Sequence, residues 1–201
     1  MNNHREPRLP SRIRIVVADA NVLYSRCLRD YLLYAGEHGL IAPHWSGHIL
    51  ADMADHLIKN RSNFDQDAAQ RLTAAMTNAF PDALVTPLPE HFDRLQNYVL
   101  PDDDDRDVIA SALAVEASII CTNNLKHFPK NVMNDLGIVA ITPDTLFVQL
   151  INDDLAQMIE VHNDSVRYFH GATDASTLSA LRRARASRTA DLMGQVLGLG
   201  G

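Results

Sequence analysis

The chain has 201 residues, 46% apolar and 21% charged, a composition typical of one globular domain with room for a small appendage. Its net charge of -7 excludes the patch-driven nucleic-acid binding of strongly basic proteins, so any such contact has to be local. Cys27 and Cys121 are too far apart to suggest a disulfide framework or a thiolate zinc site, and no apolar run reaches the length of a membrane span. We therefore expect a soluble cytoplasmic protein.

The first part of the chain alternates short apolar runs with amphipathic stretches. Residues 13–18 are rich in β-branched side chains and stop at Asp19, which predicts a buried strand. Apolar side chains at helical spacing predict a helix over residues 22–35. Two further helices and a short strand are predicted over residues 47–60, 65–80 and 82–89.

The middle of the chain continues this alternation, whereas its end does not. A predicted helix over 106–117 leads into an apolar strand over 118–122, and another strand is predicted over 136–142. Beyond residue 143 only helices are predicted, over 144–169 and 177–197. This order favours an α/β fold with a parallel sheet covered on both faces, followed by a helical extension.

Acidic residues are predicted at one edge of this sheet. Ligands of parallel sheets lie beyond the carboxyl ends of the strands, where the sequence places Asp19 and Thr122. Four aspartates, Asp102 to Asp105, precede the helix of "LPDDDDRDVIASA". Alone, they are typical of a solvated helix start. Together with Asp19 they favour a site for Mg²⁺ or Mn²⁺, which bind oxygen ligands and activate water for phosphate chemistry.

Four motifs then occur in a familiar order: "VVADANVLYS", "WSGHILADM", "PDDDDRDVIASALA" and "IICTNNLKHFP". In this order they resemble the PIN-domain ribonucleases, in particular the VapC-type toxins of type II toxin–antitoxin systems. The resemblance implies a three-layer α/β/α fold over residues 13–143, with a central parallel sheet. It leaves a basic tail at 1–12 and a helical C-terminal extension at 144–201.

The resemblance also assigns roles to individual residues. It implies an endoribonuclease whose catalytic and metal-binding acids are Asp19, Asp52 and Asp105. Asn124 matches the fourth catalytic position best, and His127 stands where aspartate is common. Accessory roles fall to Asp104, as an alternative ligand, and to Asn21, which could either orient a carboxylate or act as a local backbone cap. Thr122 could bond a ligating carboxylate or simply end a strand.

The resemblance implies an RNA substrate, a cognate antitoxin and a homodimer. Basic residues are the natural contacts for RNA phosphates or for an acidic antitoxin segment. The candidates are Arg106, Lys126, Arg182, Arg183 and Arg185, with further arginines at Arg5, Arg8, Arg12, Arg14 and Arg188. An apolar helix face containing Leu28, Leu32 and Leu33 is the predicted dimer surface.

Three alternatives remain open at this point. His48, Asp52 and His56 share one helix face and could bind zinc, although the two histidines are two turns apart. The start also resembles haloacid-dehalogenase-type phosphatases, but Asn21 breaks their aspartate pair. A degraded site would instead leave a non-catalytic RNA- or protein-binding PIN module. Four further histidines, His38, His91, His162 and His170, are expected to be exposed.

Overall fold

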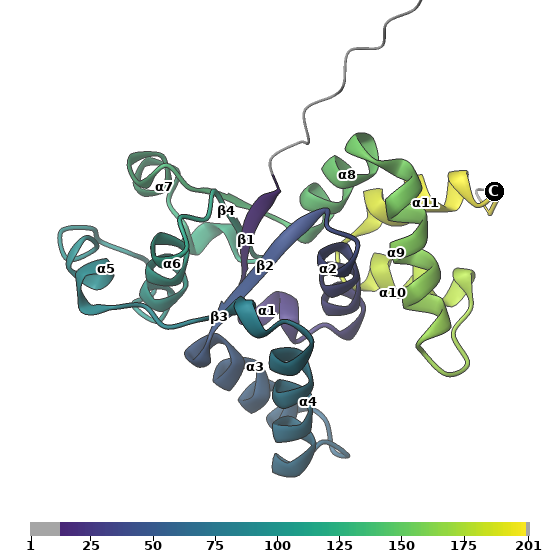
Figure 1. Ribbon diagram of the computed structural model, residues 1–201, viewed down its shortest axis with the longest axis horizontal. Helices are drawn as coiled ribbons and strands as arrows, with labels where there is room; N and C mark the ends of the chain where they lie inside the picture. The colour runs from purple at the N-terminus through teal and green to yellow at the C-terminus, as the bar shows by residue number, and fades with distance from the viewer. Residues whose placement is uncertain (1–12, 200–201) are drawn as a thin grey trace, which may run out of the picture.

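The computed structural model describes residues 13–199 and has a five-stranded parallel sheet at its centre (Figure 1). The strand order is β3-β2-β1-β4-β5, so that β1 lies in the middle. The strands are β1 (Arg14–Ala18), β2 (Ile41–Ser46), β3 (Leu84–Val85), β4 (Ile119–Cys121) and β5 (Val139–Ile141). Val16 and Val17 of β1 are fully buried, as expected for a strand covered on both faces.

Helices flank the sheet on both sides, which confirms the predicted α/β class (Figure 1). Helix α6 packs against β1, β2 and β4, while α2 contacts β2 and carries the C-terminal helices. The helices in the order of the chain are α1 (Ala20–Leu23), α2 (Arg26–Glu37), α3 (Gly47–Asn60), α4 (Gln66–Ala79), α5 (Pro89–Asp93), α6 (Asp105–Ala114), α7 (Lys130–Leu136), α8 (Pro143–Asp153), α9 (Leu155–Arg167), α10 (Asp174–Arg183) and α11 (Ser187–Val196). Every helix among residues 13–199 falls short of the length and apolar character that crossing a membrane requires.

The structure corrects several predicted boundaries. The helix predicted over 22–35 is interrupted, because Ser25 adopts an extended conformation as the N-cap of α2. The helix predicted over 144–169 breaks at Asp154, whose side chain caps α9 by accepting from the amide of Gln157 at 3.1 Å. The helix predicted over 177–197 breaks around Arg185, which has a positive φ of 66°. Strand β2 was not predicted, because Pro43 interrupts its pattern.

The C-terminal helices cover the apolar face of α2. Helix α9 lies along α2, and α10 and α11 pack against α9 and α8, respectively. Leu28 and Leu32 are therefore fully buried within a single chain, and Leu33 is half-buried. The prediction that this helix face mediates dimerisation is wrong for that reason.

His162 is the second correction in this region. It was expected to be exposed, but it is fully buried between α2 and α10. Its Nδ1 is hydrogen-bonded to the hydroxyl of Tyr31, and its Nε2 lies 3.2 Å from Asp174 Oδ1. Burial lowers the pKa of His162, so this contact joins the helical extension to α2 through a neutral imidazole near pH 7. The boundary between residues 143 and 144 remains a prediction, and the tail at 1–12 lies outside the described residues.

Candidate metal centre

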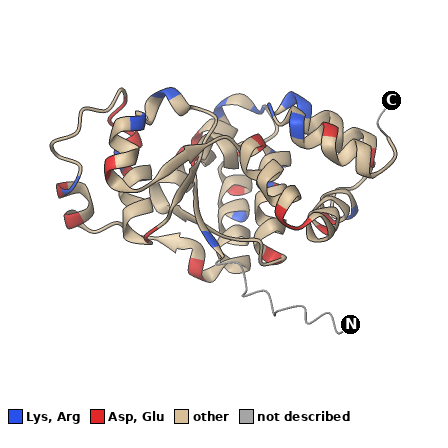
Figure 2. Ribbon diagram, turned by 90° about the horizontal axis from the view of Figure 1, so that it is seen from above, with Lys and Arg blue, Asp and Glu red and all other residues tan. Residues whose placement is uncertain are grey.

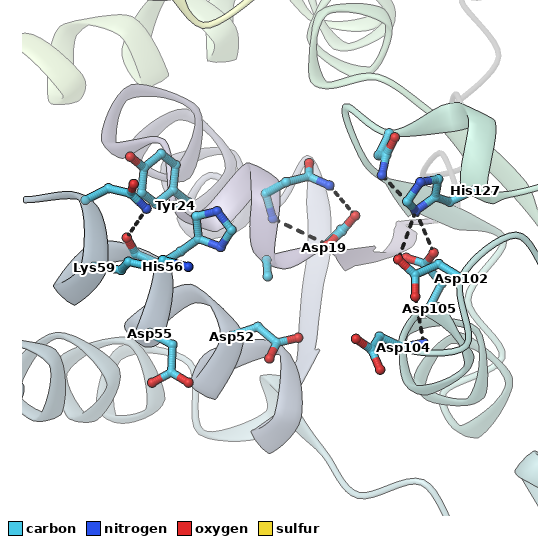
Figure 3. Close-up of a pocket in the computed structure, with 14 residues that line it drawn as sticks. Asp19, Tyr24, Asp52, Asp55, His56, Lys59, Asp102, Asp104, Asp105 and His127 are labelled. Carbon is cyan, nitrogen blue, oxygen red and sulfur yellow. Dashed lines mark hydrogen bonds and ion pairs between the residues drawn. The ribbon is translucent and has the colours of Figure 1, made fainter.

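An open cleft of about 770 Å³ lies beyond the carboxyl ends of β1 and β4 (Figure 3). Ala18 and Cys121 pair at the ends of these strands, so Asp19 and Thr122 follow at the same edge of the sheet. The side chains that line the cleft include six aspartates and one lysine: Asp19, Asp52, Asp55, Asp102, Asp104, Asp105 and Lys59. We call this the acidic cleft. It places the three predicted acids, Asp19, Asp52 and Asp105, around one space.

Asp19 is held by a network that joins two strands. It is only 7% exposed, and it accepts a hydrogen bond of 2.6 Å from the Thr122 hydroxyl and a short one from the Asn21 amide. The side-chain amide of Asn21 also contacts Thr122 Oγ1 at 3.0 Å, and Asn21 Oδ1 accepts from the backbone amide of Asn123 at 2.9 Å. Two of the three predicted accessory residues, Asn21 and Thr122, therefore contact the Asp19 carboxylate directly.

A second group of polar side chains surrounds His127. Its Nδ1 lies 2.9 Å from Asp105 Oδ2, 3.7 Å from Asp102 Oδ2 and 2.8 Å from the amide nitrogen of Asn124. One imidazole nitrogen can donate to a carboxylate or accept from an amide, but it cannot do both. These groups therefore compete for a single nitrogen.

Asp52 and Asp104 face each other across the cleft (Figure 3). Asp52 projects from the middle of α3 and Asp104 from the start of α6. Asp52 is half-exposed, and its carboxylate lies 3.5 Å from His48 Nε2. The acidic cleft thus has carboxylates on both walls, and among the described residues none of Asp19, Asp52 and Asp105 pairs with an arginine or lysine.

Burial and mutual repulsion raise the pKa values of these carboxyl groups. Burial raises the pKa of Asp105 to about 6, against the opposing effect of His127, and the charge of Asp19 adds to the rise. Burial also raises the pKa of Asp19, although hydrogen bonds from Thr122 and Asn21 oppose it. For Asp52, burial and the charge of Asp104 raise the pKa, and His48 lowers it. The ionised site is therefore short of positive charge.

The donor set fits a divalent cation. Asp102, Asp105 and His127 each offer one ligand atom, and these three atoms lie within 4.8 Å of one another. No other group of three such residues meets this criterion among residues 13–199. The zinc alternative built on His48, Asp52 and His56 is thus without a compact ligand group. His56 instead packs edge-to-face on Tyr24, with ring centroids 5.4 Å apart.

Sequence reasoning missed several residues of the cleft. Asp55 and Lys59 follow Asp52 at intervals of three and seven residues, and this helical spacing could have identified them, whereas His56 was considered only as a zinc ligand. Asp102 was part of the aspartate run, but its proximity to His127 depends on the tertiary fold.

Ser46 and Asp107 form a second contact that was not predicted. Ser46 caps α3 by accepting from the amide of Ile49 at 3.1 Å, and its hydroxyl donates to the Asp107 carboxylate. The hydroxyl of Ser111 lies 3.5 Å from the same carboxylate. This contact joins the helix that carries Asp52 to the helix that carries Asp105.

The candidate RNA contacts are dispersed over the molecule (Figure 2). Arg106 donates to the backbone carbonyls of Leu95 and Tyr98 at 2.8 and 2.9 Å, so it holds that loop rather than facing RNA. Lys126 is exposed beside the cleft, in a short 3-10 turn. Arg182 pairs with Asp191 at 2.9 Å, whereas Arg185 is exposed between α10 and α11 and Arg183 lines a separate cavity.

Comparison with known families agrees with this geometry. The PIN-domain family model matches residues 15–126, more than half of the chain. The chain belongs to the PIN-domain family. PIN domains are generally metal-dependent nucleases, which is consistent with a carboxylate-lined cleft at the edge of the sheet. No curated protein and no solved structure matches this PIN protein.

Replacing Asp105 by asparagine should stabilise the metal-free protein, with a gain that depends on pH. The folded-state pKa of about 6 exceeds the ordinary value of 3.8, so ionised Asp105 costs the folded state free energy. That cost is absent below pH 3.8, grows between pH 3.8 and about 6, and is complete above a pH of about 6. The free energy of unfolding of Asp105→Asn should therefore exceed that of the wild type by more at about pH 7.5 than at about pH 5.

Thermal unfolding in the presence of a chelator measures this difference. Solvent screening limits the gain to on the order of 1 kcal/mol, which corresponds to a rise of roughly 2–4 °C in midpoint. The control is Asp135→Asn, which neutralises an exposed aspartate on α7 and should change little at either pH. Equal gains at both pH values, or a loss near pH 7.5, would contradict the account of Asp105.

Proposed function

We propose that this PIN protein is an endoribonuclease that hydrolyses RNA phosphodiester bonds with Mn²⁺ or Mg²⁺ in the acidic cleft. The convergence of Asp19, Asp52 and Asp105 from three separate segments is the observation that carries the proposal. A cleft with six aspartates and one lysine repels a phosphate backbone unless a cation occupies it. A cation held by these carboxylates could therefore bridge them to an RNA phosphate.

The residues of the cleft have distinct roles in this proposal. Asp105, Asp102 and His127 would hold the cation, with Asp19 and Asp52 as further acidic ligands. Thr122 and Asn21 orient the Asp19 carboxylate by hydrogen bonds, which fixes its position before substrate arrives. A bound divalent ion would supply an activated water and offset the charge that develops on the phosphate. Lys59, at the rim, can contact a neighbouring phosphate.

His127 favours Mn²⁺ over Mg²⁺ in this site. Imidazole suits transition metals, whereas Mg²⁺ prefers an all-oxygen shell with several retained waters. His127 occupies the position at which the toxins that this sequence resembles commonly carry aspartate. Its ring lies close enough to the Asp105 and Asp102 carboxylates for the three side chains to share one ion. The side-chain amide of Asn124 contacts the same Nδ1, so a metal bound at Nδ1 would displace this contact.

The motif order supports a finer proposal, that the protein is the toxin of a type II toxin–antitoxin system. In this role it would act in the cytoplasm, as a homodimer, and be restrained by a cognate antitoxin. Because the C-terminal helices cover the apolar face of α2, a homodimer would have to form through another surface. The presence of His127 where an acid is common supports one competing proposal, a non-catalytic RNA- or protein-binding module.

Cleavage of single-stranded RNA separates these proposals. Wild-type protein should cleave with Mn²⁺, more slowly with Mg²⁺, and should be inactive in a chelator. Asp19→Asn and Asp105→Asn should each lose more activity than the roughly 10–100-fold that removal of an outer-shell partner costs. Asp135→Asn, outside the cleft, should cleave at the wild-type rate. If Asp105→Asn also does so, the proposed role of the cleft is wrong.

Expression in a bacterial host tests the toxin role separately. Induced wild-type protein should arrest growth because it cleaves cellular RNA, and Asp105→Asn produced at the same level should not. Colony counts after induction measure growth, and immunoblots measure the amount of each protein. Normal growth with a folded protein that cleaves RNA in vitro would refute the toxin role and leave the nuclease proposal intact.

A further inference from the structure

A second cavity lies beside the acidic cleft, between the start of α2 and the C-terminal helices. It has a volume of about 380 Å³, within the range of small-ligand sites. Its polar and aromatic lining includes Arg26, Asp30, Arg61, Phe169 and Arg183. We call it the basic cavity. Helices α9 and α10 build one of its walls, so it depends on the region beyond the matched PIN domain.

The basic cavity has an excess of positive charge. Its lining holds three arginines and one acidic residue, Asp30. The Oδ2 atom of Asp30 lies 3.3 Å from Arg26 Nε. Arg61 and Arg183 are exposed, and neither has a carboxylate within ion-pair distance among residues 13–199; the Arg183 guanidinium donates to Ser179 Oγ at 2.7 Å. Uncompensated guanidinium groups around a concavity, in a chain with net charge -7, favour an anionic ligand.

The cavity also offers an aromatic surface. The guanidinium carbon of Arg26 lies 3.2 Å above the centre of the Phe169 ring. Phe169 nevertheless remains 49% exposed. A ring and a guanidinium stacked in this way present planar surfaces on which a nucleobase can stack. Phosphate-binding arginines and a stacking surface together fit a nucleotide better than a simple anion.

Two short segments connect the basic cavity to the acidic cleft. Lys59 and Asn60 line the cleft, and the next residue, Arg61, lines the cavity. Tyr24 lines the cleft, and Arg26 lines the cavity two residues later. The Arg61 guanidinium carbon also lies 5.7 Å from the centre of the Tyr24 ring, so the two spaces share a boundary.

We infer that the basic cavity binds a nucleotide of the RNA strand that flanks the phosphate held in the acidic cleft. Arg61 and Arg183 contact its phosphate groups, and Phe169 with Arg26 stacks on its base. This inference rests on the proposed ribonuclease function. An acidic peptide segment of a protein partner is the competing occupant, but RNA is favoured because the cavity continues directly from the cleft.

The test compares two double variants in metal-free buffer. Arg61→Ala/Arg183→Ala removes two arginines of the cavity, and Arg71→Ala/Arg94→Ala removes the same charge from exposed positions on α4 and after α5. Fluorescence anisotropy with single-stranded RNA gives Kd as a function of salt. Each lost phosphate contact should flatten the slope of log K against log salt by about 0.7, so the cavity variant should lose about 1.4.

At about 0.1 M salt, the RNA affinity of the cavity variant should fall on the order of tenfold, while that of the control stays within about twofold. With metal, the cavity variant should show a higher KM for single-stranded RNA than the wild type, whereas Arg71→Ala/Arg94→Ala should keep the wild-type KM. An unchanged slope, or equal losses in both double variants, would overturn the inference. The inference would also be overturned if the cavity variant lost binding to an aspartate-rich peptide but kept its RNA affinity.

The outcomes also separate this inference from the proposed function. If wild-type protein cleaves RNA but the two double variants bind it alike, the nuclease proposal stands and the basic cavity has no role in RNA binding. If wild-type protein does not cleave RNA but the salt slope depends on Arg61 and Arg183, the nuclease proposal fails and RNA binding in the cavity stands.

Discussion

The buried carboxylate of Asp19 is the constraint on which the rest of the site depends. An ionised group at the end of a covered strand is costly unless it is compensated. Thr122 and Asn21 donate hydrogen bonds to it. The side-chain oxygen of Asn21 also accepts from the backbone amide of Asn123, which links this network to the chain after β4. These contacts fix the carboxylate but do not cancel the effect of burial, because its pKa remains raised. A cation would supply the missing compensation.

The fold separates negative from positive charge. The break at Ser25 between α1 and α2 leaves Tyr24 in the acidic cleft and Arg26 in the basic cavity. The C-terminal helices cover the apolar face of α2 and also complete the cavity wall with Phe169 and Arg183. Under the proposed function, this arrangement would let one part of the surface hold RNA while the acidic cleft, with a bound metal, cleaves it.

Much of the fold could be predicted from local patterns. The apolar runs of β1 and β4, and the rule that ligands lie beyond the carboxyl ends of parallel strands, were enough to place Asp19 beside Thr122. Pro43 concealed β2. The apolar face of α2 was predicted to be a dimer surface, because the local pattern does not show that helices of the same chain cover Leu28. The contact of His127 with Asp105 spans 22 residues, and no local pattern encodes it.

In the proposed site, the acidic cleft binds a divalent cation through Asp105 and His127. Anomalous scattering from crystals soaked in Mn²⁺ tests it most directly, because it locates the ion independently of any activity. One or more anomalous peaks are expected in the cleft, with a peak roughly 2–2.5 Å from a carboxylate oxygen of Asp105 and from a ring nitrogen of His127. Strong peaks elsewhere, with none in the cleft at saturating Mn²⁺, would contradict it.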